Sequence, residues 1–322
     1  MTWKIHFNLL LTILVAFATS VSVKAQHKVE MLPFGDMDQW VDRQIKESGI
    51  IGGNTKHVWA IAPTSTVKGD IAYKNMGGSP WATSNVMAKV AGITKTNTSV
   101  FPEKRGDGFC ARLDTRMESV KVLGVVNITV LAAGSVFTGS VHEPIKGTKN
   151  PQKMLQTGIP FTKKPVALQF DYKVKMSDRE NRIRATGFSK ISDVAGKDFP
   201  AVVLLLQKRW EDANGNIFAK RIGTIVNYYY LSTDWKNNAT YEVMYGDISG
   251  RPEYKAHMMR LNATQNYTVN SKGESVPIQE VAWGDADDVP THLYVQFTSS
   301  HGGAYVGSPG NSFWVDNVRL VY

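Results

Sequence analysis

The chain has 322 residues, one cysteine and a formal net charge of +9, from 37 Lys and Arg against 28 Asp and Glu. The basic residues are dispersed along the sequence, which is typical of a solvated surface and argues against a nucleic-acid partner. Cys110, the only cysteine, excludes an internal disulfide. Its setting in GFCARLD predicts a small buried hydrophobic side chain.

The first 25 residues have the pattern of an export signal. Lys4 gives a basic start, an apolar run covers residues 9–18, and Val23-Lys24-Ala25 precedes a cleavage point at Gln26. The apolar run is shorter than the roughly 20 residues that a membrane-spanning helix needs. We therefore expect cleavage after Ala25, no membrane span, and a single domain over residues 26–322 that works in the periplasm or outside the cell.

Two short helices are predicted. The first covers residues 35–49, where apolar residues recur at helical spacing, with Asp36 as N-cap and Gly49 as the end. The apolar residues of this helix are Met37, Trp40, Val41 and Ile45. The second helix lies in residues 150–158, with Asn150 as the cap and Pro151 in the first turn.

Most of the remaining chain alternates apolar and polar residues with a period of two, which predicts half-buried antiparallel strands. The candidate strands are residues 57–63, 108–114, 119–134, 165–175, 201–210, 216–231, 238–246, 253–262, 292–299 and 310–322. Asn214-Gly215 predicts a hairpin turn between two of the longest. Many strands with few helices predict an all-β fold, an antiparallel β-sandwich of jelly-roll type with one or two short helices.

The terminal strand carries an Asp-Asn pair in its middle, in FWVDNVRLVY. Alternation predicts Trp314 and Asp316 on one face, and Phe313 and Val315 on the other. Because untied chain ends fray, we expect this strand to pair inside a sheet of the core.

The same strand resembles the last strand of jelly-roll carbohydrate-binding modules. In several of those modules the Asp holds a structural calcium together with groups near the N-terminus. The resemblance implies a calcium site made by Asp316 with Asp36 or Asp38. The alternative for Asp36 is capping of the predicted helix. No other cofactor is indicated.

An ordered set of motifs is similar to one family over roughly residues 30–322. The motifs are GDGFCARLDT (106–115), LAAGSVFTGSV (131–141), TGIPFTKKPVALQFDYK (157–173), FPAVVLLLQKRW (199–210) and WVDNVRLVY (314–322). They resemble the secreted "putative carbohydrate metabolism domain" family of Bacteroidetes-type bacteria. This resemblance implies a β-sandwich, export and a link to glycan use, and it supplies no catalytic residues.

Aromatic side chains are the candidate glycan-binding residues, because the C–H face of a pyranose stacks on an aromatic ring. The candidates are Trp81 and Trp235 in predicted loops, Trp283 beside acidic residues, and Tyr228, Tyr230 and Tyr241 on neighbouring strands. The acidic residues that follow Trp283 in GDADD offer acceptors for sugar hydroxyls. The alternative reading is structural: the loop tryptophans close an end of the sandwich, and the tyrosines form cross-strand pairs.

These features favour an exported glycan-binding protein that serves bacterial carbohydrate acquisition, with a polysaccharide or oligosaccharide as its partner. The first alternative is a glycan-active enzyme of glycoside hydrolase type, which needs two carboxyl groups about 5 to 10 Å apart. No spacing in the sequence identifies such a pair, and GxSxG and HExxH motifs are absent. The second alternative is a non-catalytic surface-assembly subunit, which needs an exposed sheet edge or apolar patch.

Overall fold

The computed structural model describes residues 27–73, 77–90, 92–122, 126–147, 150–187, 190–258, 260–262 and 265–322. The predicted signal peptide lies outside these residues and stays a prediction. Within them, the two helices are short 3-10 segments, η1 (Gly49–Ile51) and η2 (Pro151–Met154). No helix among the described residues is long and apolar enough to cross a bilayer.

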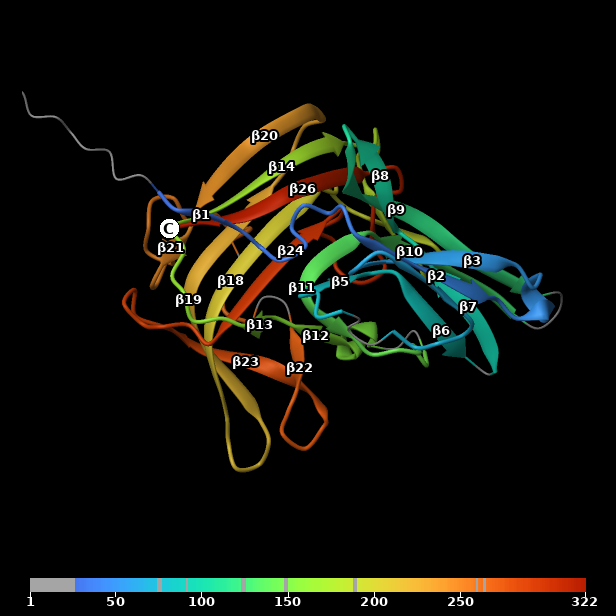
Figure 1. Ribbon diagram of the computed structural model, residues 1–322, viewed down its shortest axis with the longest axis horizontal. Coiled ribbons are helices and arrows are strands. Elements are labelled where there is room, and N and C mark those ends of the chain that lie inside the picture. The colour runs from blue at the N-terminus through green and yellow to red at the C-terminus, as the bar shows by residue number, and fades with distance from the viewer. Residues whose placement is uncertain are drawn as a thin grey trace, which may run out of the picture.

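Two large sheets pack face to face (Figure 1). The first sheet has the order β16 (Thr186–Gly187), β10 (Val126–Ala133), β9 (Gly108–Val122), β26 (Ser312–Val321), β14 (Ala167–Lys175) and β20 (Thr233–Glu242), with β1 (Val29–Met31) beside β26 and β8 (Val100–Arg105) beside β9. All pairings in this sheet are antiparallel. The terminal strand β26 lies between β9 and β14, so the prediction that it pairs inside the core is confirmed.

The second sheet is mixed, because β23 runs parallel to β19 while the other strands pair antiparallel. Its order is β12 (Leu155–Thr157), β11 (Ser135–Val141), β24 (His292–Thr298), β18 (Ala201–Glu211), β19 (Ile217–Tyr228), β23 (Ser275–Trp283) and β22 (Tyr267–Val269), with β13 (Ile159–Pro160) beside β24, β21 (Met244–Tyr245) beside β19 and β5 (Trp81–Thr83) beside β11. The β18–β19 hairpin turns at Asn214-Gly215 as predicted, with Gly215 at φ 89°.

The main core fills the space between the two sheets. Alternate residues of β14 and β18, such as Phe170 and Leu204, meet there and are fully buried. The opposite face of the second sheet is also apolar: Val203, Leu205 and Tyr294 form a second buried cluster. That second face is the floor of the cleft described below.

Three smaller sheets surround the sandwich. They are β17 (Ser192–Val194), β15 (Arg182–Arg184) and β25 (Val306–Gly307); β3 (Thr55–Ile61), β2 (Trp40–Lys46) and β4 (Ser65–Lys68); and the hairpin of β6 (Val86–Val90) with β7 (Ile93–Asn97). The all-β sandwich predicted from the sequence is confirmed.

The terminal Asp-Asn pair lies at a β-bulge. The register of β14 on β26 shifts between Gln169 and Asp171, and Asn317 adopts φ 54°. Before the bulge Phe313 and Val315 face the core, and after it Val318 and Leu320 do. Strict alternation predicted the opposite face for Val318, because an extra residue moves every later side chain to the other face.

The helix predicted over residues 35–49 is wrong, since residues 40–46 form strand β2. This strand pairs with β3 and β4 and buries Val41, Arg43 and Ile45 on one face. Arg43 is buried because its guanidinium binds Glu143, whose side chain is fully buried. A buried arginine hides the period-two pattern, and the remaining apolar residues imitate helical spacing.

Two further predictions need correction. Residues 253–262 form turns rather than a strand over their described part, with local backbone hydrogen bonds such as Tyr254 N to Arg251 O at 3.0 Å. The second predicted helix is only the short segment η2, and Asn150 makes no side-chain capping hydrogen bond.

Candidate functional site

A cleft of about 520 Å³ lies over the second face of the large mixed sheet. Strands β11, β18, β19 and β24 form its floor, and the β6–β7 hairpin and β10 contribute walls. Its volume falls within the roughly 300–1,000 Å³ typical of small-molecule sites. Most lining side chains are aliphatic or aromatic, and the polar ones are mainly hydroxyls and amides.

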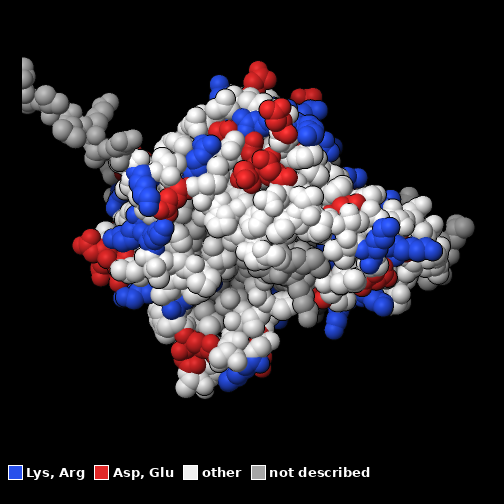
Figure 2. Space-filling model, viewed as in Figure 1, with Lys and Arg blue, Asp and Glu red and all other residues white. Residues whose placement is uncertain are grey.

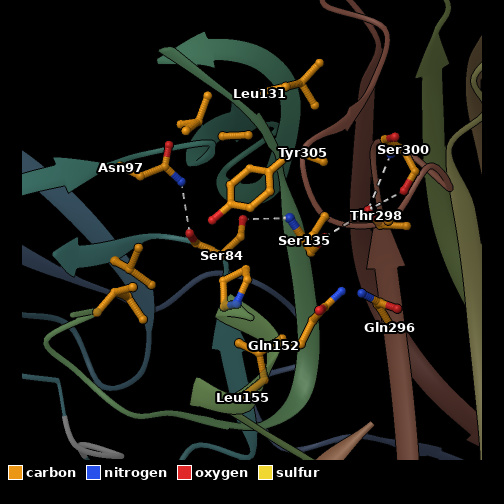
Figure 3. A pocket seen from close by; sticks show the side chains of 18 of the residues that line it. Ser84, Asn97, Leu131, Ser135, Gln152, Leu155, Gln296, Thr298, Ser300 and Tyr305 are labelled. Carbon is orange, nitrogen blue, oxygen red and sulfur yellow. Dashed lines mark hydrogen bonds between the residues drawn. The ribbon is translucent and has the colours of Figure 1, made fainter. Parts of the chain in front are cut away.

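A chain of hydroxyl groups crosses the floor of the cleft (Figure 3). Ser135 Oγ donates to Thr298 Oγ1 at 2.9 Å, and Thr298 Oγ1 donates to the carbonyl oxygen of Ser300 at 2.9 Å. Ser84 Oγ accepts the backbone N–H of Ser135 at 2.9 Å. The paired strands β11 and β24 therefore hold the hydroxyls of Ser135 and Thr298 in fixed positions.

Two amide side chains add hydrogen-bonding capacity. Gln296 lies on the floor strand β24, and Gln152 lies on η2 at the border of the cleft (Figure 3). Neither side chain hydrogen-bonds another described residue, and both are partly exposed. A free carboxamide offers two donors and an acceptor, so these groups can pair with ligand hydroxyls.

One end of the cleft is aromatic. The Tyr228 ring lies between His257 and His301, with centroid distances of 4.6 and 4.8 Å. Tyr228 and His301 line the cleft, and Figure 3 shows Tyr305 projecting into it. Phe199 stacks on His301 at 5.4 Å. The rings are thus held by one another, which limits the entropy that a ligand must remove on binding.

The cleft contains few charges. Among its described lining residues, Glu118 is the one carboxylate and Lys95 the one ammonium group. Glu118 Oε1 is 3.0 Å from Arg116 Nε, and Lys95 Nζ lies 3.0 Å from Glu47 Oε1. Figure 2 shows that the middle of the viewed face is largely free of charged side chains. The lining therefore suits an uncharged ligand.

The structure corrects the prediction for Trp81. This residue starts β5, is 1% exposed and packs against Phe297 in the core. Its indole N–H donates to the carbonyl oxygen of Pro33 at 2.8 Å. Since neither face of the ring is open to a ligand, the structural alternative holds for Trp81.

The three predicted tyrosines do not form one platform. Tyr228 and Tyr230 both contact the ring of Phe199, with centroid distances of 6.4 and 4.6 Å, and Tyr230 is 54% exposed. Tyr241 faces the core instead: it stacks on Phe170 at 5.4 Å and accepts the hydroxyl hydrogen of Tyr229 at 3.0 Å. Tyr241 is therefore a packing residue.

Trp235 lies in strand β20, not in a loop, on the outer face of the first sheet. The guanidinium of Arg105 sits 3.9 Å from the centroid of its ring. Arg105 also donates to Asp316 and, at 2.9 Å, to Asp171. One face of the Trp235 ring is therefore covered by an ion-pair network that spans β8, β14 and β26.

The three residues of the predicted calcium site are not brought together as a ligand set. Among the described residues, no group of three His, Cys, Asp or Glu is placed to hold a metal ion. Asp316 binds Arg105, while Asp38 Oδ1 accepts the N–H of Phe109 at 2.7 Å. Asp36 Oδ1 accepts the N–H of Asp38 at 3.4 Å, at a turn before β2 rather than at a helix.

Trp283 lies in a second, separate pocket. It ends β23, is partly exposed and shares the pocket with Asp247, Asp285 and Arg251. Asp285, one of the acidic residues that follow Trp283 in the sequence, therefore lines the same pocket, and a role for Trp283 in glycan binding stays a prediction.

The sequence reading missed the polar residues of the cleft floor. Period two in HLYVQFTS places Tyr294, Gln296 and Thr298 on one face of β24, opposite Leu293 and Val295. These polar residues on a strongly apolar strand are the sequence feature that could have indicated the cleft floor. Tyr305 follows no regular pattern, since it lies in a turn with φ 63°.

The fold and the cleft define the class of the protein: an all-β sandwich with a ligand-sized cleft over one sheet. The chain belongs to the family described as "Putative carbohydrate metabolism domain", which matches residues 64–321. This match confirms the resemblance seen in the sequence and places the protein among carbohydrate-related domains.

A crystal structure from Bacteroides thetaiotaomicron, described as a "putative glycoside hydrolase", is similar in part. It is 17% identical, covers 84% of this chain and 81% of its own, and has a TM-score of 0.45. A likeness of this degree assigns no activity to this chain. No curated protein matches the sequence.

Proposed function

We propose that the protein binds a glycan non-covalently in the cleft and serves carbohydrate acquisition by a bacterium that exports it. The family match supports a glycan as the ligand. The observation that carries the proposal is the composition of the cleft: fixed hydroxyls, two amides without protein partners, and the rings of Tyr228 and Tyr305. Rings bind the apolar faces of a sugar, and the polar groups orient its hydroxyls.

The charges of the cleft favour binding over hydrolysis. A glycosidase of the common type needs two carboxyl groups about 5 to 10 Å apart across the scissile bond. Glu118 is the one carboxylate among the described lining residues, and it is engaged by Arg116. A lone, ion-paired carboxylate does not provide the second carboxyl group that this mechanism requires.

Affinity electrophoresis of the purified protein tests this function. Native gels would contain arabinoxylan, galactomannan, mixed-linkage β-glucan, starch or polygalacturonate, and a reducing-end assay would run on the same polysaccharides. We expect retardation by at least one neutral polysaccharide without release of reducing ends. Release of reducing ends would favour the hydrolase alternative, and no retardation by any of them would favour a surface-assembly role.

A further inference from the structure

The second pocket has the composition of a sugar site of its own. It has a volume of about 580 Å³ and lies between β21, the end of β23 and the turn that follows it. None of its described lining residues also lines the cleft. A ligand in this pocket would therefore contact a different part of the protein.

The aromatic ring of this pocket belongs to Trp283 and packs on a buried arginine. Trp283 pairs with Arg221 across the parallel strands β23 and β19, and the Arg221 guanidinium carbon is 5.2 Å from the ring centroid. Arg221 is 1% exposed, and its Nε donates to Glu280 Oε1 at 2.8 Å. Because a buried ion pair supports one face, the ring keeps a fixed orientation toward the pocket.

The rim supplies acceptors and a donor. Asp247 Oδ1 accepts the Oγ–H of Ser249 at 2.7 Å and its N–H at 2.9 Å, and these bonds lower the pKa of Asp247, which stays ionised at neutral pH. Asp285 is exposed, and its carboxylate accepts no hydrogen bond from another residue of the described ranges. The exposed Arg251 lines the same pocket.

A stacking ring beside carboxylates and a guanidinium suits a pyranose with vicinal hydroxyls. The ring takes the apolar C–H face of the sugar, each carboxylate accepts two neighbouring hydroxyls, and the arginine donates to a ring or hydroxyl oxygen. The two carboxylates are balanced by Arg251 and by Lys164, whose Nζ donates to the carbonyl oxygen of Ala286 at 2.6 Å, so the rim offers no net attraction to uronic acids or sulfated sugars.

We propose that the Trp283 pocket is a second saccharide-binding site, selective for uncharged sugars and independent of the cleft. The inference rests on the proposed function only for the ligand class. When two sites engage one polysaccharide chain, the second contact is intramolecular and multiplies the affinity. Loss of either site should then weaken polysaccharide binding far more than it weakens binding of a monosaccharide.

Trp210 provides a matched control for the test. It is 43% exposed and stacks on Phe218 at 5.9 Å, and it lines neither pocket. Affinity electrophoresis in the neutral polysaccharide gels would compare wild type with Trp283→Ala, Asp285→Ala and Trp210→Ala. The cleft variants Tyr305→Ala and Gln296→Leu complete the set. Thermal melting of each variant checks that it is folded, and Asp285→Ala keeps the test valid where Trp283→Ala unfolds.

We expect Trp283→Ala and Asp285→Ala to raise the dissociation constant for a neutral polysaccharide roughly tenfold or more, with Trp210→Ala unchanged. Values equal to the control would overturn the second site, and so would retardation confined to polygalacturonate or absent from every gel. If only the cleft variants weaken binding, the proposed function stands without the second site. If only the Trp283 and Asp285 variants do, the second site stands and the cleft assignment fails.

Discussion

Arg105 in β8 donates a hydrogen bond to Asp316 in β26, 211 residues later in the chain. The same Nη1 donates to Asp171 in β14 at 2.9 Å, so one guanidinium joins two carboxylates on the outer face of the sheet. Asp171 in turn accepts the N–H of Asn238 at 2.7 Å, and Asp316 accepts that of Asn317 at 2.7 Å. The acidic residues thus satisfy backbone groups that the irregular strand pairings leave without ladder partners.

The pKa values of Asp316 and Asp171 are shifted in opposite directions. Burial raises the pKa of Asp316 to about 6, although Arg105 opposes the rise. Burial also acts against ionisation of Asp171, but the Asn238 N–H and Arg105 outweigh it and hold the pKa of Asp171 below its usual value. A carboxyl group whose pKa is raised in the folded state adds to the stability of the protein at low pH, and this contribution is lost as the pH rises.

We therefore expect the stability advantage of wild type over Asp316→Asn to be greatest near pH 4 and to decline up to about pH 6. Urea unfolding of both proteins at several pH values measures this difference. The comparison removes the contributions of carboxylates that both proteins share. An advantage that grows across the same interval would mean that the Arg105 ion pair outweighs burial.

Chelation should leave the melting temperature unchanged. A structural calcium bound only by the folded state would stabilise it, and its removal would lower the melting temperature. Asp316 instead binds Arg105, and no set of three suitable ligands occurs among the described residues. Differential scanning fluorimetry with calcium and with EDTA checks this. A fall in melting temperature with EDTA that calcium reverses would restore the calcium site implied by the resemblance.

Removal of the Glu143 carboxylate should be strongly destabilising. Glu143 accepts hydrogen bonds from Arg43 and from the backbone N–H groups of Tyr73 and Met87, both at 2.9 Å. The Glu143 side chain is fully buried and that of Arg43 is 2% exposed, so Glu143→Ala leaves an unpaired buried charge. We expect the free energy of unfolding to fall by about 3–5 kcal/mol.

The exposed pair Lys197–Glu180 is the matched control for that experiment, since its side chains are 51% and 77% exposed. Glu180→Ala should change the stability little, because exposed ion pairs contribute little. Equal effects of Glu143→Ala and Glu180→Ala in urea unfolding would show that Glu143 does not join the small β2 sheet to the sandwich.

Cys110 should be unreactive in the native protein. The side chain is 1% exposed, and burial, together with the negative charges of Glu103 and Asp316, raises the pKa of the thiol to about 12. Because the thiolate is the reactive form, a thiol reagent at pH 8 should label the protein only as it unfolds. Labelling of the native protein as fast as in denaturant would place Cys110 at the surface.

The sequence predicted the strands whose two faces differ in polarity. The sequence of strand β14 alternates because Leu168, Phe170 and Val174 face the core, while the polar residues between them lie on the outer face. Strand β2 was misread because Arg43 occupies a core-facing position, and its partner Glu143 lies 100 residues away. A single sequence does not reveal which distant acid neutralises a buried base.

The site was harder to predict than the fold. The local sequence of Trp81 indicates an exposed loop, although β11 and the core cover this residue. Gln296 and Thr298 lie on a strand whose two faces are both buried or enclosed, so burial alone does not distinguish the cleft face from the core face. Trp283 stays a predicted glycan-binding residue, and its acidic neighbours are adjacent in the chain.

Isothermal titration with an oligosaccharide of the retarding polysaccharide tests the central claim most directly. Wild type, Tyr305→Ala, Gln296→Leu and the control Trp210→Ala would be titrated under identical conditions. The account predicts that the two cleft variants bind roughly tenfold or more weakly, which corresponds to the loss of about 1.4 kcal/mol, while the control binds as wild type. Cleft variants that bind as tightly as wild type would contradict the assignment of the cleft as the glycan site.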